Sequence, residues 1–297
     1  MAILVDQPRW PAHGTVFGHL VSDSSLDELH AFADRAGLSP RAFDHDHYDV
    51  PEERYPQLIA LGATEVASAE LLKRLVRAGL RVRTRDRTPK RPAAQRLVAA
   101  SWQALLPGTP GLLGDLLGRW GEPHRRYHDV RHLAQCLTAL GQLGADPASH
   151  RPVLLAAWFH DAVHNGQPGR DEQASAALAA RELDRWLPAA EVAEVVRLVL
   201  LTIGHDPEPD DTAGALLVDA DLSVLGQNRG RYHVYLRDIR AEYLQYSDAD
   251  FTAGRLAVVR GLLDRPTLFH TERGRELWLD AARRNLSEEA TRLQPVG

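Results

Sequence analysis

The sequence predicts a mainly α-helical protein in which an all-α domain follows a small α/β domain. Two patterns and the chain length support this fold class. After about residue 91, helix-length apolar segments are separated by short connections rich in proline and glycine. Before about residue 83, short β-branched segments alternate with helix-length ones. A length of 297 residues favours two domains over one.

The first domain, residues 1–83, is predicted to begin with two strands and to continue with helices. Ser24 or Ser25 can cap the first helix, because Glu28 stands three residues after Ser25, and Gly37 is placed to end it. Proline at position 51 suits the first turn of a second helix. The predicted strands are 2–5 and 15–21, and the predicted helices are 25–36, one from residue 51, and 68–78.

A basic segment separates the two domains. Ten lysine and arginine residues between Lys73 and Arg96 face a single acid, Asp86, and Pro89 and Pro92 interrupt the segment. No aromatic side chains alternate with the charges, as they do where bases stack. We therefore interpret residues 84–95 as a solvated linker and do not expect a nucleic-acid partner.

The second domain, residues 96–297, is expected to be all-α from its helix-length apolar segments. Alternating strand patterns are nearly absent, and the breaks fall at Pro-Gly, Asp-Pro and Asn-Gly pairs. The predicted helices are 92–105, 112–120, 129–143, 152–164, 171–186, 189–203, 212–225, 229–246, 251–263 and 273–293.

Composition excludes several classes of protein. A formal net charge of -5 gives no overall field that selects nucleic acid or membrane surfaces. The single cysteine, Cys136, precludes an intramolecular disulfide and fits a reducing compartment. The first apolar run ends at Asp6, too early for a signal peptide, and no run reaches the ~18 residues of a membrane span. We expect a cytoplasmic protein without membrane contact.

Three short segments supply histidine and aspartate at spacings suited to a metal site. They are Tyr127–His132, His160–His164 and Asp219–Leu222. If the first two are helical, histidines four residues apart share one helix face. An apolar run, residues 154–159, precedes His160 and Asp161, and burying such a pair is costly without a partner or a metal.

The candidate ligands come from three different helices. We expect His132, His160, Asp161 and Asp221 to converge on one or two divalent transition-metal ions, since imidazole with carboxylate suits Mn, Fe, Co, Ni or Zn. Asp219 is a weaker candidate, because on a helix it would face nearly the opposite way from Asp221. Cys136 is interpreted as a small buried hydrophobe.

The segments YHDVRH, FHDAVHNG and DADLSVLG resemble the motifs of the HD superfamily of metal-dependent phosphohydrolases. The wider resemblance covers most of residues 92–290 and is to an uncharacterised bacterial branch. It implies an HD-type all-α domain in which the four ligands are those given above. It also implies that His128 is the general acid and that His164 lies near a second metal or the leaving group. Asp161 or Asp221 would then orient the attacking hydroxide.

The implied activity is hydrolysis of a phosphoester in a nucleotide or small phosphorylated metabolite by a metal-activated hydroxide. Cyclic nucleotides are not supported as substrates, because the purine-clamping residues of the phosphodiesterases have no counterpart. Weaker candidates for substrate contact are His205, Arg240 and Glu172. Two alternatives stay open: a regulatory module that binds nucleotide without turnover, and an HD-type di-iron oxygenase.

Residues 1–83 resemble a small bacterial domain of unknown function, which has no activity to transfer. The resemblance rests on segments 10–14, 18–23, 28–30 and 46–51. Five polar residues in these segments could form a second site: His13, His19, Asp46, His47 and Asp49. We favour the interpretation that they cap and shape turns.

Overall fold

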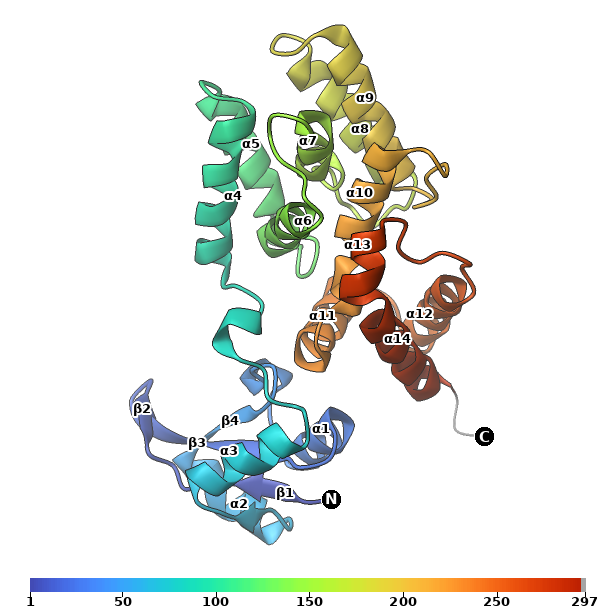
Figure 1. Ribbon diagram of the computed structural model, residues 1–297. Helices are drawn as coiled ribbons and strands as arrows, with labels where there is room; N and C mark the ends of the chain where they lie inside the picture. Colours follow the sequence, from blue (N-terminus) through green and yellow to red (C-terminus); the bar gives the residue numbers. More distant parts are fainter. Residues whose placement is uncertain (295–297) are drawn as a thin grey trace. The chain divides into compact units, whose positions relative to one another are not determined.

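The computed structural model describes residues 1–294 and divides the chain into two compact units (Figure 1). The N-terminal unit contains residues 1–87 together with 228–237, and the helical unit contains residues 88–227 together with the chain from residue 238 onward. Within the described residues, no helix has the combined length and apolar character needed to cross a bilayer. The expected fold class, mainly α with a small α/β domain, is confirmed.

The N-terminal unit is a small mixed sheet with helices. Strand order is β2-β3-β1-β5, with β4 paired to β3, and all pairs are antiparallel except β1 with β5. Ser25 caps α1 by accepting a hydrogen bond from the Glu28 N–H at 3.1 Å, as its sequence context predicts. The elements are β1 (Ile3–Val5), β2 (Trp10–Ala12), β3 (Thr15–Ser22), α1 (Leu26–Arg35), β4 (Tyr48–Pro51), α2 (Tyr55–Ala60), β5 (Thr64–Glu65) and α3 (Ser68–Arg77).

The register of the sheet brings polar residues into one row. In the β3–β4 pair, His19 stands directly opposite Asp49. On the opposite edge of β3, strand β1 ends at Val5. The next residue still contacts β3, because the Asp6 N–H donates to the His19 carbonyl at 3.2 Å. Glycine is required at position 18, where β3 passes Asp6, because a Cβ there would lie 2.5 Å from the Asp6 carbonyl oxygen.

The helical unit consists of the helices from α4 onward, apart from the first part of α11, which belongs to the N-terminal unit. A 3₁₀ segment (Leu222–Gly226) follows α10, and a π-helical segment (Arg275–Leu279) precedes α14. The helices are α4 (Arg91–Leu105), α5 (Pro110–Trp120), α6 (Val130–Gln142), α7 (Arg151–Phe159), α8 (Arg170–Leu183), α9 (Ala189–Leu201), α10 (Thr212–Asp221), α11 (Arg229–Glu242), α12 (Asp248–Leu263), α13 (Glu272–Gly274) and α14 (Asp280–Leu293).

Helix α7 lies at the centre of the helical unit. It packs against α6, α9 and α10 (Figure 1), and every residue from Val153 to Phe159 is buried. Burying one large apolar side chain contributes roughly 1.5–3 kcal/mol, so this helix is a rigid support for whatever follows it. The two residues that follow are His160 and Asp161.

One predicted helix boundary near the candidate ligands is wrong: α7 ends at Phe159 rather than at residue 164. Helix α6 begins at Val130, within one residue of the predicted start at 129, so His128 precedes it. The pairs His128/His132 and His160/His164 therefore do not share a helix face; each pair spans a helix end. Strands β2, β4 and β5 were not predicted, because they are only two to four residues long and β2 and β4 each contain a proline.

Candidate metal centre

His132 is placed by the first turns of α6. The cap residue Asp129 accepts a hydrogen bond from the Arg131 N–H at 2.8 Å and another from Arg91 Nε at 2.7 Å. These contacts fix where the helix starts, and His132 follows on its buried side with 2% of its surface exposed. Its ring therefore lies in the interior of the unit.

His160 and Asp161 occupy a turn after α7 although no glycine or proline is present to end that helix. The turn is held from two directions. Arg125 donates to the Asp161 carbonyl, and Ser175 Oγ accepts the N–H of Val163 at 3.0 Å. A few residues later, Asp171 accepts the N–H groups of Asn165 and Gln167, both at 2.8 Å. These contacts, rather than local sequence preference, turn the chain after Phe159.

Asp221 ends α10, which packs against both α6 and α7. Its carboxylate Oδ2 lies 2.7 Å from His205 Nε2. His205 has φ 52°, an uncommon conformation for a residue other than glycine, and Arg265 donates to its carbonyl at 2.9 Å. His205 is thus held against the cluster through Asp221.

The four predicted ligands converge. The Nε2 atoms of His132 and His160 are 3.1 Å apart, and Asp221 Oδ1 lies 3.1 Å from His132 Nε2 and 3.7 Å from His160 Nε2. Asp161 Oδ2 lies 3.6 Å from His132 Nε2 and 3.3 Å from His160 Nε2. We refer to His132, His160, Asp161 and Asp221 as the four-ligand cluster.

These separations fit a coordination polyhedron. Ligand atoms about 2.1 Å from one ion are about 3.0 Å apart at right angles and about 3.4 Å apart at the tetrahedral angle. The proton of the His160 ring is also placed suitably, because Nδ1 lies 2.9 Å from the carbonyl of Ala157, which can only accept. In the neutral ring, Nε2 then offers a lone pair to the cluster. The donor set therefore fits a divalent transition metal.

The charges of the cluster depend on each other. Burial raises the pKa of both carboxyls, but His160 lowers the pKa of Asp161 and of Asp221 far below the usual range. Burial likewise lowers the pKa of His160, while Asp161 and Asp221 raise it to about 9. The two carboxylates thus stay ionised and require a nearby positive charge.

A second group of ligand-type side chains adjoins the cluster. His128 Nδ1 lies 2.6 Å from Glu242 Oε2, and the His128 ring stacks on His164 with centroids 4.2 Å apart. The rings of His128 and His132 are 5.7 Å apart, which places this group beside the four-ligand cluster. His128, His164 and Glu242 offer three ligand atoms within 4.8 Å of one another.

The two histidines of this second group differ electrostatically. Burial lowers the pKa of His128, but the hydrogen bond to Glu242 raises it above the usual value. Burial and the neighbouring His128 lower the pKa of His164 to about 4. Burial raises the pKa of Glu242, but the hydrogen bond to His128 lowers it, and the resulting pKa is about 2. His128 is therefore the proton-bearing member of the pair.

Two residues of this arrangement were missed at the sequence level. Glu242 orients His128, yet its position late in a polar helix resembles that of a surface acid. Arg125 is fully buried and hydrogen-bonds to the carbonyls of His128 and Asp161, joining two of the ligand-bearing segments. Its place two residues before Tyr127, at the start of the motif, is the only sequence signal that could have identified it.

The residues predicted more weakly take different positions. Glu172 accepts the Gly169 N–H at 2.6 Å and caps α8, and Arg240 pairs with Asp248 at 2.6 Å. Asp219 points away from the cluster and accepts the N–H groups of His270 and Thr271. Cys136 Sγ lies 3.6 Å from His132 Nε2, and burial raises the pKa of its thiol well above the usual value.

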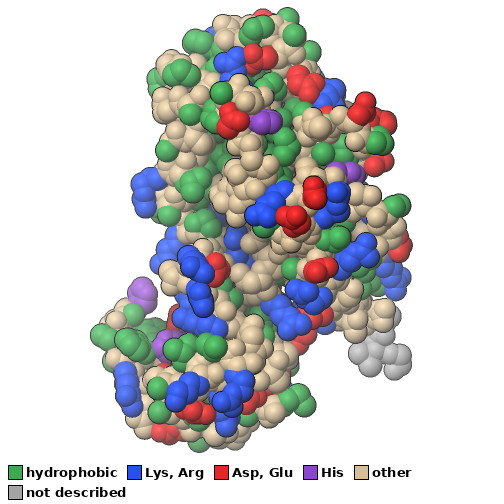
Figure 2. Space-filling view, viewed as in Figure 1, with side chains coloured by type: hydrophobic (Ala, Val, Ile, Leu, Met, Phe, Trp, Pro, Cys, Tyr) green, Lys and Arg blue, Asp and Glu red, His purple; other side chains and the backbone are tan. Residues whose placement is uncertain are grey.

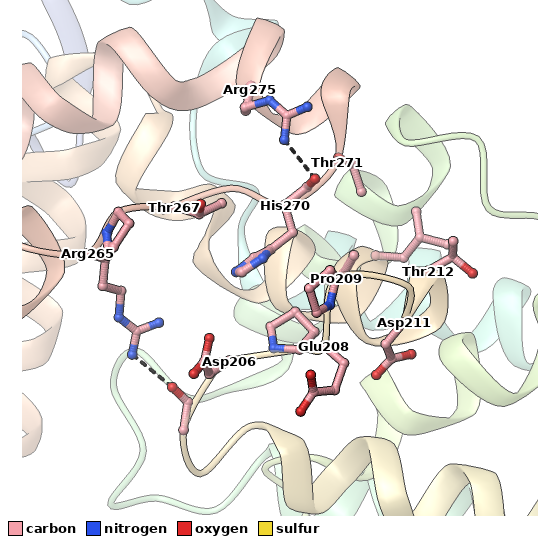
Figure 3. A pocket seen from close by; sticks show the side chains of 15 residues that line it. Asp206, Glu208, Pro209, Asp211, Thr212, Arg265, Thr267, His270, Thr271 and Arg275 are labelled. Atoms are coloured by element: carbon pink, nitrogen blue, oxygen red, sulfur yellow. Dashed lines mark hydrogen bonds between the residues drawn. The ribbon is translucent and has the colours of Figure 1, made fainter.

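A pocket of about 910 Å³ opens beside the loop that carries His205. Gly204 lines it, but none of the four-ligand cluster does. Figure 3 shows Asp206 and Glu208 on the lower side of this pocket as drawn and Arg275 at the top, where Arg275 donates to the His270 carbonyl at 2.7 Å. Charged and apolar side chains line the pocket together, and it borders both the segment around His205 and helix α10.

Comparison with known proteins is informative only for the first part of the chain. A family model described as a protein of unknown function (DUF4031) matches residues 3–78. This supports a small N-terminal domain of unknown function over nearly the expected range. No curated protein and no solved structure matches the chain.

Proposed function

We propose that the helical unit is a metal-dependent phosphohydrolase of the HD type, acting on a phosphoester of a nucleotide or a small phosphorylated metabolite. The observation that carries the proposal is the convergence in the four-ligand cluster: the two imidazole Nε2 atoms lie 3.1 Å apart, and each carboxylate has an oxygen 3.1–3.7 Å from both of them. When bound there, a divalent ion supplies a Lewis acid and an acidified water.

The surrounding residues have separate tasks in this proposal. Asp161 and Asp221 stay ionised and orient the nucleophilic water. His128 donates a proton to the leaving oxygen, and Glu242 holds its ring and stabilises the imidazolium through the 2.6 Å contact with Nδ1. Arg125 keeps the segments of His128 and Asp161 together by donating to both carbonyls.

Phosphate release tests the proposal. Wild-type protein loaded with Mn²⁺ or Co²⁺ should hydrolyse an aryl phosphate and an alkyl phosphate, whereas Asp221→Asn should lose bound metal and phosphate release together. His128→Gln should keep the ions of the four-ligand cluster and lose about 10²–10⁴ in kcat, more for the alkyl phosphate with its poorer leaving group. His150→Gln, at the far end of α7, is the matched control.

Two results would refute this assignment. One is metal-loaded wild type that binds nucleotide but releases no phosphate, which would establish a binding module instead. The other is Asp221→Asn with full phosphate release. If His128→Gln loses metal from the four-ligand cluster, the roles given to His128 and to the ligands are wrong.

A second candidate function is a di-iron oxygenase, and the adjoining His128, His164 and Glu242 group favours it. These three side chains offer ligand atoms for a second ion beside the four-ligand cluster. Oxygen uptake by the Fe²⁺-loaded protein, with two ions bound per chain and no phosphate release, would support this candidate over hydrolysis.

A further inference from the structure

The N-terminal unit contains a group of histidine and aspartate side chains that is independent of the helical unit. His19, His47 and Asp49 offer three ligand atoms within 4.8 Å of one another. The rings of His19 and His47 have centroids 5.0 Å apart, and His47 Nε2 lies 3.4 Å from Asp49 Oδ1. All three belong to the segment that matches the family of unknown function.

The sheet register explains why these three residues meet. His19 on β3 stands directly opposite Asp49 on β4, and directly opposed residues have Cβ atoms about 4.5–5.5 Å apart on the same face. His47 lies directly before β4 and contacts Asp46 and Asp49. Two of the three residues therefore stand on paired strands, and the third adjoins the start of one.

Each histidine is backed by a buried carboxylate. His47 Nδ1 lies 2.6 Å from Asp46 Oδ1, and His19 Nδ1 lies 3.3 Å from Asp6 Oδ2. Asp6 and Asp46 are 1% and 0% exposed. A carboxylate on Nδ1 fixes the ring and makes Nε2 the more basic ligand atom, which is the usual support of a metal-binding histidine.

The backing carboxylates are themselves held in place. Asp46 accepts the Val82 N–H at 2.6 Å and a hydrogen bond from Arg81 at 3.0 Å. Asp6 accepts the N–H of His19 at 2.6 Å, and the approach of these two residues requires Gly18. Arg81 therefore neutralises Asp46 without His47, and the His19 backbone N–H holds Asp6 independently of the His19 ring.

We propose that His19, His47 and Asp49 bind a divalent transition-metal ion, a set we call the sheet site. Two imidazoles and one carboxylate suit Zn²⁺, Co²⁺ or Ni²⁺ better than Mg²⁺ or Ca²⁺. Three protein ligands leave a coordination position for water or an outside ligand. That position faces solvent, because the Asp49 side chain is 48% exposed. Figure 2 shows where histidine side chains lie at the surface.

Metal stoichiometry of the full-length chain tests this proposal. After removal of metal, the protein is dialysed against Zn²⁺ or Co²⁺, and bound ions are counted by elemental analysis. His19→Gln and Asp49→Asn should each bind one ion fewer than wild type. His13→Asn is the matched control, because His13 is an exposed histidine outside the site and asparagine tolerates its φ of 50°. It should bind as many ions as wild type.

The sheet site and the four-ligand cluster are distinguished in the same experiment. Asp221→Asn should lose a different ion, so that Asp49→Asn combined with Asp221→Asn loses the sum of the two. A second readout needs no variant: Zn²⁺ should shift the ring ¹⁵N resonances of His19 and His47 in wild-type protein. Unchanged resonances, or full stoichiometry in folded His19→Gln and Asp49→Asn, would overturn the proposal.

Discussion

Replacing Arg125 by lysine should loosen the candidate metal centre while keeping the positive charge. Arg125 is fully buried, and its guanidinium donates hydrogen bonds to four acceptors. It donates to Glu122 Oε2 at 2.9 Å and to the carbonyls of His128 at 3.0 Å, Asp161 at 2.6 Å and Ala162 at 3.2 Å. A lysine ammonium is a point donor and cannot reproduce this planar fork.

The size of the effect follows from the contacts that are lost. A hydrogen bond from a charged donor contributes roughly 1.5–3 kcal/mol, and lysine can restore about half of the four. The expected loss in the free energy of unfolding is therefore about 3–6 kcal/mol, a large share of the roughly 5–15 kcal/mol typical of a folded protein. Because Arg125 holds the segments of His128 and Asp161, metal affinity should fall as well.

Urea unfolding and metal titration of Arg125→Lys check this prediction. The exposed Arg185→Lys on the same unit is the control, and it should match wild type within about 0.5 kcal/mol. If Arg125→Lys also unfolds at the wild-type urea concentration and binds metal with unchanged affinity, the guanidinium does not join the two segments, and the reasoning fails.

Three further predictions concern single side chains. His128 lowers the pKa of Glu242 from 4.5 to about 2 against the effect of burial. The Glu242 carboxylate should therefore stabilise the fold above pH 4.5 and lose that contribution as the pH falls toward 2. Wild type and Glu242→Gln should differ in stability by at most about 3 kcal/mol, and this difference should shrink as the pH falls through that range. Urea unfolding of the metal-free proteins measures it. Cys136→Ala should retain full metal content by elemental analysis, because the four-ligand cluster supplies two imidazoles and two carboxylates without the sulfur; loss of metal would make the sulfur, which lies near His132, His160 and Asp221, a ligand. Ser25→Ala should cost about 1 kcal/mol in thermal unfolding through loss of the α1 cap, and an unchanged Tm would show that the cap is not stabilising.

The helices of the second unit could be predicted because their cause is local. The apolar run that forms α7 and the breakers between helices act within a few residues of where they stand. The grouping of His132, His160, Asp161 and Asp221 was also accessible, since burying histidine and aspartate next to apolar helices suggests mutual pairing.

The geometry at the helix ends could not be predicted, because its cause is distant in sequence. The turn after Phe159 is set by Arg125, which lies more than thirty residues earlier, and by Asp171 on the next helix. Likewise, β4 forms because β3 pairs with it, whereas Tyr48–Pro51 alone, with four residues and a proline, is too short to predict a strand. Glu242 was missed for the same reason, since its partner His128 is over one hundred residues away.

The two proposed sites should select different metals, because their donor sets differ in charge and hardness. The four-ligand cluster has two ionised carboxylates and two imidazoles, whereas the sheet site has one carboxylate and two imidazoles. Carboxylate oxygen favours the harder Mn²⁺, and imidazole favours Zn²⁺ and its neighbours.

A competition experiment follows from this difference. With one equivalent of Mn²⁺ and one of Zn²⁺ per chain, Asp221→Asn should lose mainly Mn²⁺ and Asp49→Asn mainly Zn²⁺. The backing groups strengthen the contrast, since His19 and His47 are supported by carboxylates and His160 only by a carbonyl. Carboxylate support makes an imidazole the better donor to a borderline ion. If both variants lose the same metal in the same proportion, the number of carboxylate ligands does not set the selectivity of either site.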